Sequence, residues 1–230
     1  MKSMRVEKIF MIIVLFTGIA ANTAPLAFNK KIGISYPIPV KTLTLRSVGA
    51  YDGWVLESSE TSNIGRTLNS TATSYRLGDD AAKKQYRGIL SFSTGASLPD
   101  TAVITKIILK IKKSAVVGGG NPLTIFQGFM VDIKNGTFGT TVLQASDFQT
   151  AASNMYGPFK PALVSGWYSI ILTNAKNYIN KLSSGSGLTQ IRLRFKLDDN
   201  NNTVANYLSL YSGNAGMLNS PQLIIQYYVP

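Results

Sequence analysis

The sequence contains neither cysteine nor histidine among its 230 residues. The lack of cysteine excludes disulfides, thiolate metal sites and a cysteine nucleophile. The lack of histidine excludes the Ser-His-Asp triad and every metal site that needs an imidazole ligand. These two absences together remove a large part of enzyme chemistry.

Charge is scarce and has mainly one sign. Only 15% of the residues are charged, against about 25% in ordinary soluble domains. The 11 acidic residues are outnumbered by 23 Lys and Arg, which gives a net charge of +12 and favours polyanionic partners. A glycosidase needs two carboxylates that face one cleft, whereas the pairs Asp79/Asp80 and Asp198/Asp199 are adjacent in sequence, and neighbours on strands or turns tend to diverge. We therefore expect a non-catalytic protein.

No hydrophobic run is long enough to span a bilayer. The apolar stretch over 9–21 follows Lys2, Arg5 and Lys8 and ends in small residues. Its length of about 13 residues is short of the roughly 20 that a membrane helix needs, whereas it suits a secretory signal peptide. We expect residues 1–21 to be removed, which leaves an extracellular or cell-surface protein without a membrane span.

Residues 22–42 carry three prolines and no clear period, which predicts a linker or N-terminal extension. The alternating stretch IGISYPIPV within it suggests a second role. Such a segment could add to the sheet edge of a neighbouring molecule and allow self-assembly.

From residue 43 to 230 the sequence predicts a single all-β domain. In VITKIILKIKK, the residues Val103, Thr105, Ile107, Leu109 and Ile111 share one face, and lysines occupy the other. In QIRLRFKL, Ile191, Leu193, Phe195 and Leu197 point inward, and Arg192, Arg194 and Lys196 point outward. QYRGILSF places Leu90 and Phe92 opposite Arg87. The remaining strands are expected over 43–47, 52–57, 73–78, 123–133, 167–172, 206–212 and 221–229.

These segments amount to about ten strands, which suits a β-sandwich of two packed antiparallel sheets. One or two short helical excursions are expected. Residues 146–153 begin with Ser146 and carry Gln149 three positions later, a capping-box pattern. Residues 174–182 could form a second short helix behind Asn174.

The order of several motifs is similar to that of a known family. The matching residues are Val55, Ser58, Asn63, Gly65, Leu77, Gly78, Arg87, Phe92, Leu98, Pro99, Ala102, Ile104 and Leu109. With the closing segment SPQLIIQYY, they resemble DNRLRE-type domains over residues 45–229. The resemblance implies a jelly-roll sandwich of the kind found among carbohydrate-binding modules, often with a structural calcium ion. The chain departs from the pattern at Ile108, where many relatives have alanine.

Sugar binding needs aromatic faces for the pyranose ring and polar groups for its hydroxyls. A tyrosine strip beside basic residues would suit an acidic polysaccharide, because guanidinium groups pair with carboxylates. The structural alternative is that the tryptophans are core residues and the basic rows are a solvated face. The candidate carbohydrate-binding residues are Trp54, Arg87, Trp167, Arg192, Arg194, Tyr207 and Tyr211.

A dense set of oxygen donors predicts a possible structural Ca²⁺ site, since calcium takes 6–8 such ligands. The alternative is a solvated turn, which Asp and Asn also favour. The candidate metal ligands are Asp52, Asp80, Asp198, Asp199, Asn200 and Asn202.

The sequence therefore predicts a secreted, non-catalytic protein that binds polysaccharide, preferably acidic. No nucleic-acid-binding motif accompanies the positive charge. The alternative is a structural subunit of an extracellular filament, sheath or matrix, assembled through residues 22–42.

Overall fold

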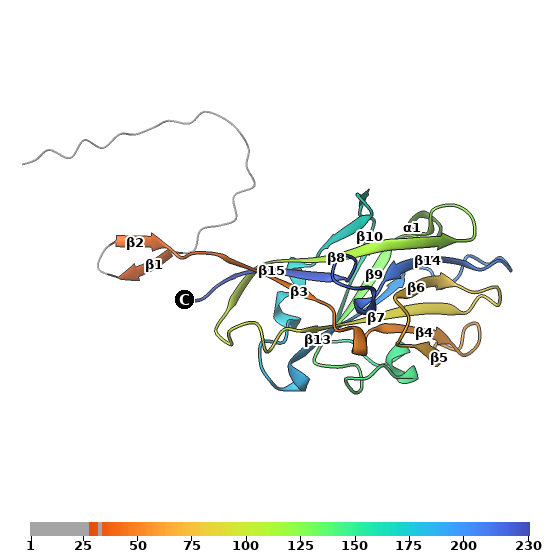
Figure 1. The fold of residues 1–230 in the computed structure, drawn as a ribbon, viewed down its shortest axis with the longest axis horizontal. Helices are drawn as coiled ribbons and strands as arrows, with labels where there is room; N and C mark the ends of the chain where they lie inside the picture. The colour runs from red at the N-terminus through yellow and green to blue at the C-terminus, as the bar shows by residue number, and fades with distance from the viewer. Residues whose placement is uncertain (1–27, 32–33) are drawn as a thin grey trace, which may run out of the picture.

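A computed structural model of the chain describes residues 28–31 and 34–230 (Figure 1). The predicted signal peptide lies outside these residues. The strands are β1 (Phe28–Lys31), β2 (Ile34–Pro37), β3 (Lys41–Arg46), β4 (Gly53–Glu57), β5 (Gly65–Asn69), β6 (Ser74–Asp79), β7 (Gln85–Ser93), β8 (Val103–Val117), β9 (Phe129–Asn135), β10 (Asn154–Phe159), β11 (Leu163–Val164), β12 (Trp167–Ile171), β13 (Leu188–Phe195), β14 (Asn206–Tyr211) and β15 (Gln222–Tyr228).

The helical segments are short, and most are 3₁₀ turns. They are η1 (Gly49–Tyr51), α1 (Pro122–Ile125), η2 (Ala145–Phe148), η3 (Thr173–Tyr178), η4 (Gly185–Gly187) and η5 (Gly213–Ala215). The protein is thus all-β with few helical excursions, as predicted. Among the described residues, no helix is both long and apolar enough to cross a membrane.

Strand β8 joins two groups of strands into one curled antiparallel sheet. Its first part pairs with β12 and β15, and β15 also pairs with β3. From Lys113 onward β8 pairs instead with β14, which continues through β6 to β7, β13, β9 and β10. The two predicted sheets are therefore continuous, and their inner sides contribute to a single core.

The core follows the predicted alternation along its two clearest strands. Ile107, Leu109 and Ile111 are fully buried on β8, and so are Ile191 and Leu193 on β13. On β7, the inward residues Leu90 and Phe92 are buried as well. Period-two patterning thus identified the inner face of the sheet.

The prediction for the start of β8 is wrong by one residue. Val103 is exposed and Ile104 is buried, opposite to the expected phase. Gln226 pairs with Lys106 and Tyr227 with Ile104, so Thr105 is an extra residue in the ladder. Such a bulge reverses the side on which the following residues point.

Two further local predictions need correction. The expected strand over 123–133 begins as the helical turn α1, where the Asn121 side chain accepts the N–H of Leu123 and Pro122 occupies the first turn. The strand β9 starts only at Phe129. The capping box near residue 146 is shifted, because Gln144 and Asp147 form it and a 3₁₀ turn follows.

Part of the predicted linker forms a hairpin. Strands β1 and β2 pair with each other and make a separate two-stranded sheet within the described residues. The hypothesis that this segment drives self-assembly stays a prediction.

The segment over 136–153 covers the outer side of β4 and β7. Phe138, Leu143 and Phe148 from this segment pack against Val55 and Ile89 in a second apolar cluster. Ile89 alternates with the core residue Leu90, so the cluster lies on the opposite side of the sheet from the main core. This cover changes the surroundings of every polar residue beneath it.

Candidate functional site

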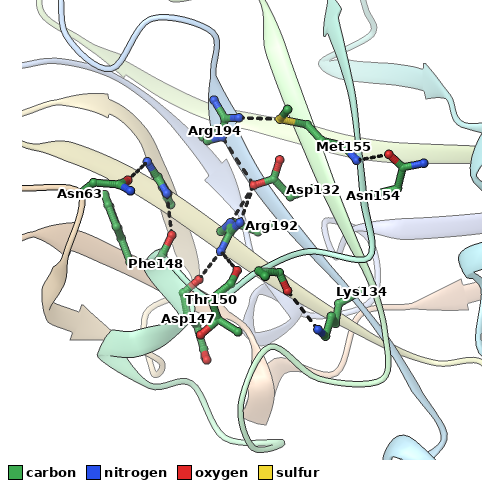
Figure 2. A network of polar contacts seen from close by, with 12 residues as sticks. Asn63, Asp132, Lys134, Asp147, Phe148, Thr150, Asn154, Met155, Arg192 and Arg194 are labelled. Carbon is green, nitrogen blue, oxygen red and sulfur yellow. Dashed lines mark hydrogen bonds and ion pairs between the residues drawn. The ribbon is translucent and has the colours of Figure 1, made fainter.

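Three arginines predicted to bind carbohydrate meet in one pocket. Arg87 on β7 and Arg192 and Arg194 on β13 line a cavity of about 460 Å³ with Asp132 of β9. The amide side chains of Asn63, Gln149 and Asn154 complete its polar lining with Met155. We call this cavity the arginine pocket; Figure 2 shows its polar contacts.

Strand register brings the charges together. Strand β13 lies between β7 and β9, with Leu193 opposite Gly88 and Arg192 opposite Asp132. Because β13 and β7 are antiparallel, the next position after Leu193 and Gly88 places Arg194 opposite Arg87. Two cations therefore face each other across neighbouring strands, an arrangement that is unfavourable unless an anion offsets it.

Arg192 is buried, although the sequence pattern predicted an outward-facing residue. Its Nε and Nη2 donate to Asp132 Oδ2 at 2.8 and 2.7 Å. Its Nη1 donates to the carbonyls of Asp147 and Thr150, and its guanidinium lies over the Phe138 ring. The physical reason for the difference is the covering segment over 136–153, which excludes water from this part of the outer face.

Arg87 is held by three hydrogen bonds. Its Nε donates to Gln85, its Nη1 to the carbonyl of Phe148 at 2.6 Å, and its Nη2 to Asn63 at 2.8 Å. Burial and, after it, repulsion from Arg192 and Arg194 together lower the pKa of Arg87 to about 9. An added anion would favour the charged form of Arg87.

Arg194 has the weakest partners of the three. Its Nε lies 3.5 Å from Asp132 Oδ2, and its Nη1 donates to the carbonyl of Phe195 at 3.3 Å. Its Nη2 donates to the sulfur of Met155, which is a weak acceptor. Since a guanidinium carries five N–H donors, Arg87 and Arg194 each keep two that have no partner among the described residues.

Among the described residues, Asp132 is the one carboxylate that lines the arginine pocket, and only one of its two oxygens has a partner. Its Oδ2 binds Arg192 and Arg194, whereas its Oδ1 is buried with no hydrogen-bond partner in the described part of the chain. In Figure 2 the two oxygens of Asp132 diverge, and one of them carries all the dashed contacts. The site thus combines spare donors with one spare, buried acceptor.

The aromatic candidates lie elsewhere. Trp54 and Tyr207 meet around Arg76, whose guanidinium lies 5.1 and 4.9 Å from their ring centroids. Tyr86 completes this cluster and packs edge-on against both rings. The predicted tyrosine strip beside Arg192 does not form, because β14 pairs with β6 and β8 and not with β13.

The other two aromatic candidates stand apart from the cluster. Trp167 on β12 packs against lysines of β8, with the ammonium groups of Lys110 and Lys112 at 5.1 and 5.5 Å from its ring centroid. Tyr211 is half-buried at the far end of β14, opposite Ser74. The seven predicted residues therefore occupy several places, and only the arginines share a pocket.

The six candidate calcium ligands do not converge. Asp52 is buried beside Ser91 and accepts the N–H groups of Ser91 and Gly213. The loop over 198–202 lies near the opposite end of β7. There Asp79 accepts the N–H group of Asn200 in the loop and that of Asn206 after it. The two places cannot supply ligands to one ion.

Within the loop, the oxygens already accept hydrogen bonds. Asp198, Asp199, Asn200 and Asn202 each accept a backbone N–H one or two residues later. Asp80 accepts the N–H groups of Ala82 and Lys84 and pairs with the Lys84 ammonium. These are the contacts of Asx turns. No cluster of three acidic side chains suited to a metal occurs in the described ranges, and the calcium site stays a prediction.

Sequence reasoning missed several residues of the arginine pocket. Asp132 alternates with the buried Val131 and Ile133, a signal that places it on the outer face, but its partner depends on strand order. Asn154 and Met155 belong to β10, which was not predicted because NMYGPF shows no alternation and contains a proline. Arg76 alternates with Tyr75 and Leu77, which would have placed it on a surface with Tyr207.

Comparison with known proteins assigns the chain to no family. No family model matches the chain, and no curated protein matches it. The resemblance to DNRLRE-type domains therefore stays a prediction.

Proposed function

We propose that this protein is a non-catalytic binding protein that acts outside the cell and holds acidic polysaccharide at the arginine pocket. The observation that carries the proposal is the meeting of Arg87, Arg192 and Arg194 around a single carboxylate. A pocket with this charge excess favours an anionic ligand, and planar guanidinium groups match the geometry of a carboxylate.

The surroundings of the arginine pocket support a sugar rather than a bare ion. A volume of about 460 Å³ lies within the range of roughly 300–1,000 Å³ for small-molecule pockets. Asn154 donates both of its amide hydrogens to Tyr156 and Tyr178, whereas the amide nitrogens of Asn63 and Gln149 have no acceptor among the described residues and can donate to hydroxyl groups. Each of the three amide oxygens accepts one hydrogen bond and has room for a second. The net charge, +12 for the whole chain and +10 without residues 1–21, would raise the local concentration of a polyanion around the whole molecule.

Retention on immobilised polygalacturonate tests the proposal. We expect Arg194→Gln to weaken binding about tenfold, because one charge-assisted contact to each bound carboxylate is lost. Arg66→Gln is the matched control, since Arg66 is exposed on β5 outside the arginine pocket and its replacement removes the same charge. Raising the salt concentration should weaken the wild-type interaction.

The comparison of the two variants decides between a site and a general charge effect. Equal losses in Arg194→Gln and Arg66→Gln would mean that overall charge causes the retention and would contradict the proposal. A wild-type protein that passes through the column at low salt would contradict it as well. Arg192 is unsuitable for this test, because its replacement would leave Asp132 buried without its closest partner.

A further inference from the structure

The orphaned acceptor in the arginine pocket specifies the ligand more closely. Asp132 is 2% exposed, and its Oδ1 has no hydrogen-bond partner among the described residues. An unpaired buried acceptor is costly, and its cost disappears when a donor arrives. Asp132 lines the arginine pocket, and because its Oδ1 has no exposed surface, a donor on a bound ligand reaches this oxygen once the side chains that cover it move aside.

A simple anion cannot satisfy Asp132. Acetate or sulfate would accept hydrogen bonds from Arg87 and Arg194, but it has no donor for Oδ1 and would be repelled by the carboxylate. A neutral sugar has the opposite fault, because its hydroxyls satisfy Oδ1 but leave the cationic donors without an anion. The arginine pocket therefore favours a ligand that carries a carboxylate and a hydroxyl donor on one ring.

Resting on the proposed function, we infer that the arginine pocket binds a single uronic acid unit, with its carboxylate on Arg87 and Arg194 and one of its hydroxyls donating to Asp132 Oδ1. The spare N–H donors of the two arginines lie on their terminal nitrogens, where a carboxylate can bind in a bidentate manner. Met155 is the contact that the ligand replaces, since a carboxylate oxygen is a stronger acceptor than the Met155 sulfur.

Arg192 has a positioning role in this arrangement. It holds Oδ2 of Asp132 with two hydrogen bonds and is itself fixed by the carbonyls of Asp147 and Thr150. The orientation of the carboxylate is therefore set before a ligand arrives. A preorganised acceptor of this kind rejects analogues that lack the matching hydroxyl.

The test compares three probes by protein-detected NMR titration. Galacturonate carries both groups, cyclohexanecarboxylate carries the ring and the carboxylate without hydroxyls, and galactose carries hydroxyls without the carboxylate. We expect galacturonate to bind the wild-type protein about tenfold or more tightly than either of the others, with shifts at Arg87, Asp132 and Arg194.

Asp132→Asn should narrow the difference between galacturonate and cyclohexanecarboxylate to about threefold or less, because the charged acceptor is gone. Asp100→Asn is the control, since it removes the same charge from an exposed loop residue and should leave the difference unchanged. If Asp132→Asn does not fold, the wild-type comparison decides by itself.

Each outcome has a separate meaning. Equal affinities of galacturonate and cyclohexanecarboxylate in the wild type would overturn the inference and leave the proposed function standing. Binding of neither carboxylate would overturn both. Shifts confined to residues outside the arginine pocket would overturn the inference and move the search to another surface.

Discussion

Asp52 illustrates how burial and hydrogen bonding compete at one residue. Its side chain is fully buried at the start of β4, and its two oxygens each accept a backbone N–H at 2.9 Å. Burial raises the pKa of Asp52 to about 7, although the hydrogen bonds from the N–H groups of Ser91 and Gly213 act in the opposite direction. Desolvation of the charged form is thus the larger effect.

The raised pKa of Asp52 predicts a pH-dependent stability. The native state keeps the proton up to about pH 7, whereas the unfolded chain releases it near 3.8. Stabilisation that is complete below pH 3.8 is therefore lost as the pH rises through 7, by an amount on the order of 4 kcal/mol. We expect Asp52→Asn to lack this part of the pH dependence in urea unfolding measured from pH 4 to 8.

The control for Asp52 is Asp100→Asn, which removes an exposed carboxylate and should keep the wild-type profile. Other carboxyls with a raised pKa, such as Asp79 and Asp147, contribute equally to both curves. Parallel profiles for the wild type and Asp52→Asn would show that Asp52 ionises in the folded protein as easily as in the unfolded chain.

At the residue scale, the sequence was sufficient to choose the arginines but not to describe their surroundings. Alternation along β13 correctly separated Arg192 and Arg194 from the core residues between them. It could not show that Arg192 is buried, because the covering residues lie some forty positions away along the chain. Nor could it pair Arg192 with Asp132, since that contact depends on the order of strands in the sheet.

At the scale of elements, a glycine lets β6 and β7 make a close contact. A Cβ atom on Gly88 of β7 would lie 2.3 Å from the ring of Tyr75 on β6. Tyr75 is itself fully buried in the main core. The absence of a side chain at position 88 therefore allows the Tyr75 ring to pack directly on the β7 backbone.

This contact predicts that Gly88→Ala destabilises the protein by about 1–3 kcal/mol, the usual cost of overpacking a core. Chemical denaturation gives the free energy of unfolding. Gly119→Ala is the matched control, since a Cβ at that position meets no atom within 4 Å. Equal stability of Gly88→Ala and the wild type would mean that β6 moves away from β7 without cost.

All ten segments that were predicted as strands contain a strand, and their shared feature is alternation. Two of the strands that were not predicted lack this alternation. Gly65–Asn69 and Asn154–Phe159 lie mostly exposed, so no buried face imposes a period on their sequence. Their structure depends on pairing with β4 and β9 instead. Local sequence cannot reveal a strand that tertiary pairing alone defines.

At the scale of the whole molecule, β15 occupies a central place. It lies between β3 and β8, and Leu223 and Ile225 are fully buried in the core. Residues near the two ends of the described chain thus meet, with Gln222 opposite Arg46. One part of the curled sheet lacks its middle strand until β15 is in place.

We therefore expect removal of residues 222–230 to abolish folding. Far-ultraviolet circular dichroism and limited proteolysis should show an unfolded, rapidly cleaved chain, because both neighbouring strands lose their hydrogen-bond partner. Removal of Pro230 alone is the control, since this exposed residue lies beyond β15. A truncated protein with a native-like melting transition would show that β3 and β8 can pair without it.

The position of β15 also bears on how the protein is made. A ribosome releases residues 222–228 after every other described strand of the curled sheet, so this sheet cannot close before that segment has been made. Until then β3 and β8 lack the strand that lies between them, so the hydrogen bonds on both sides of β15 form late in the folding of the nascent chain.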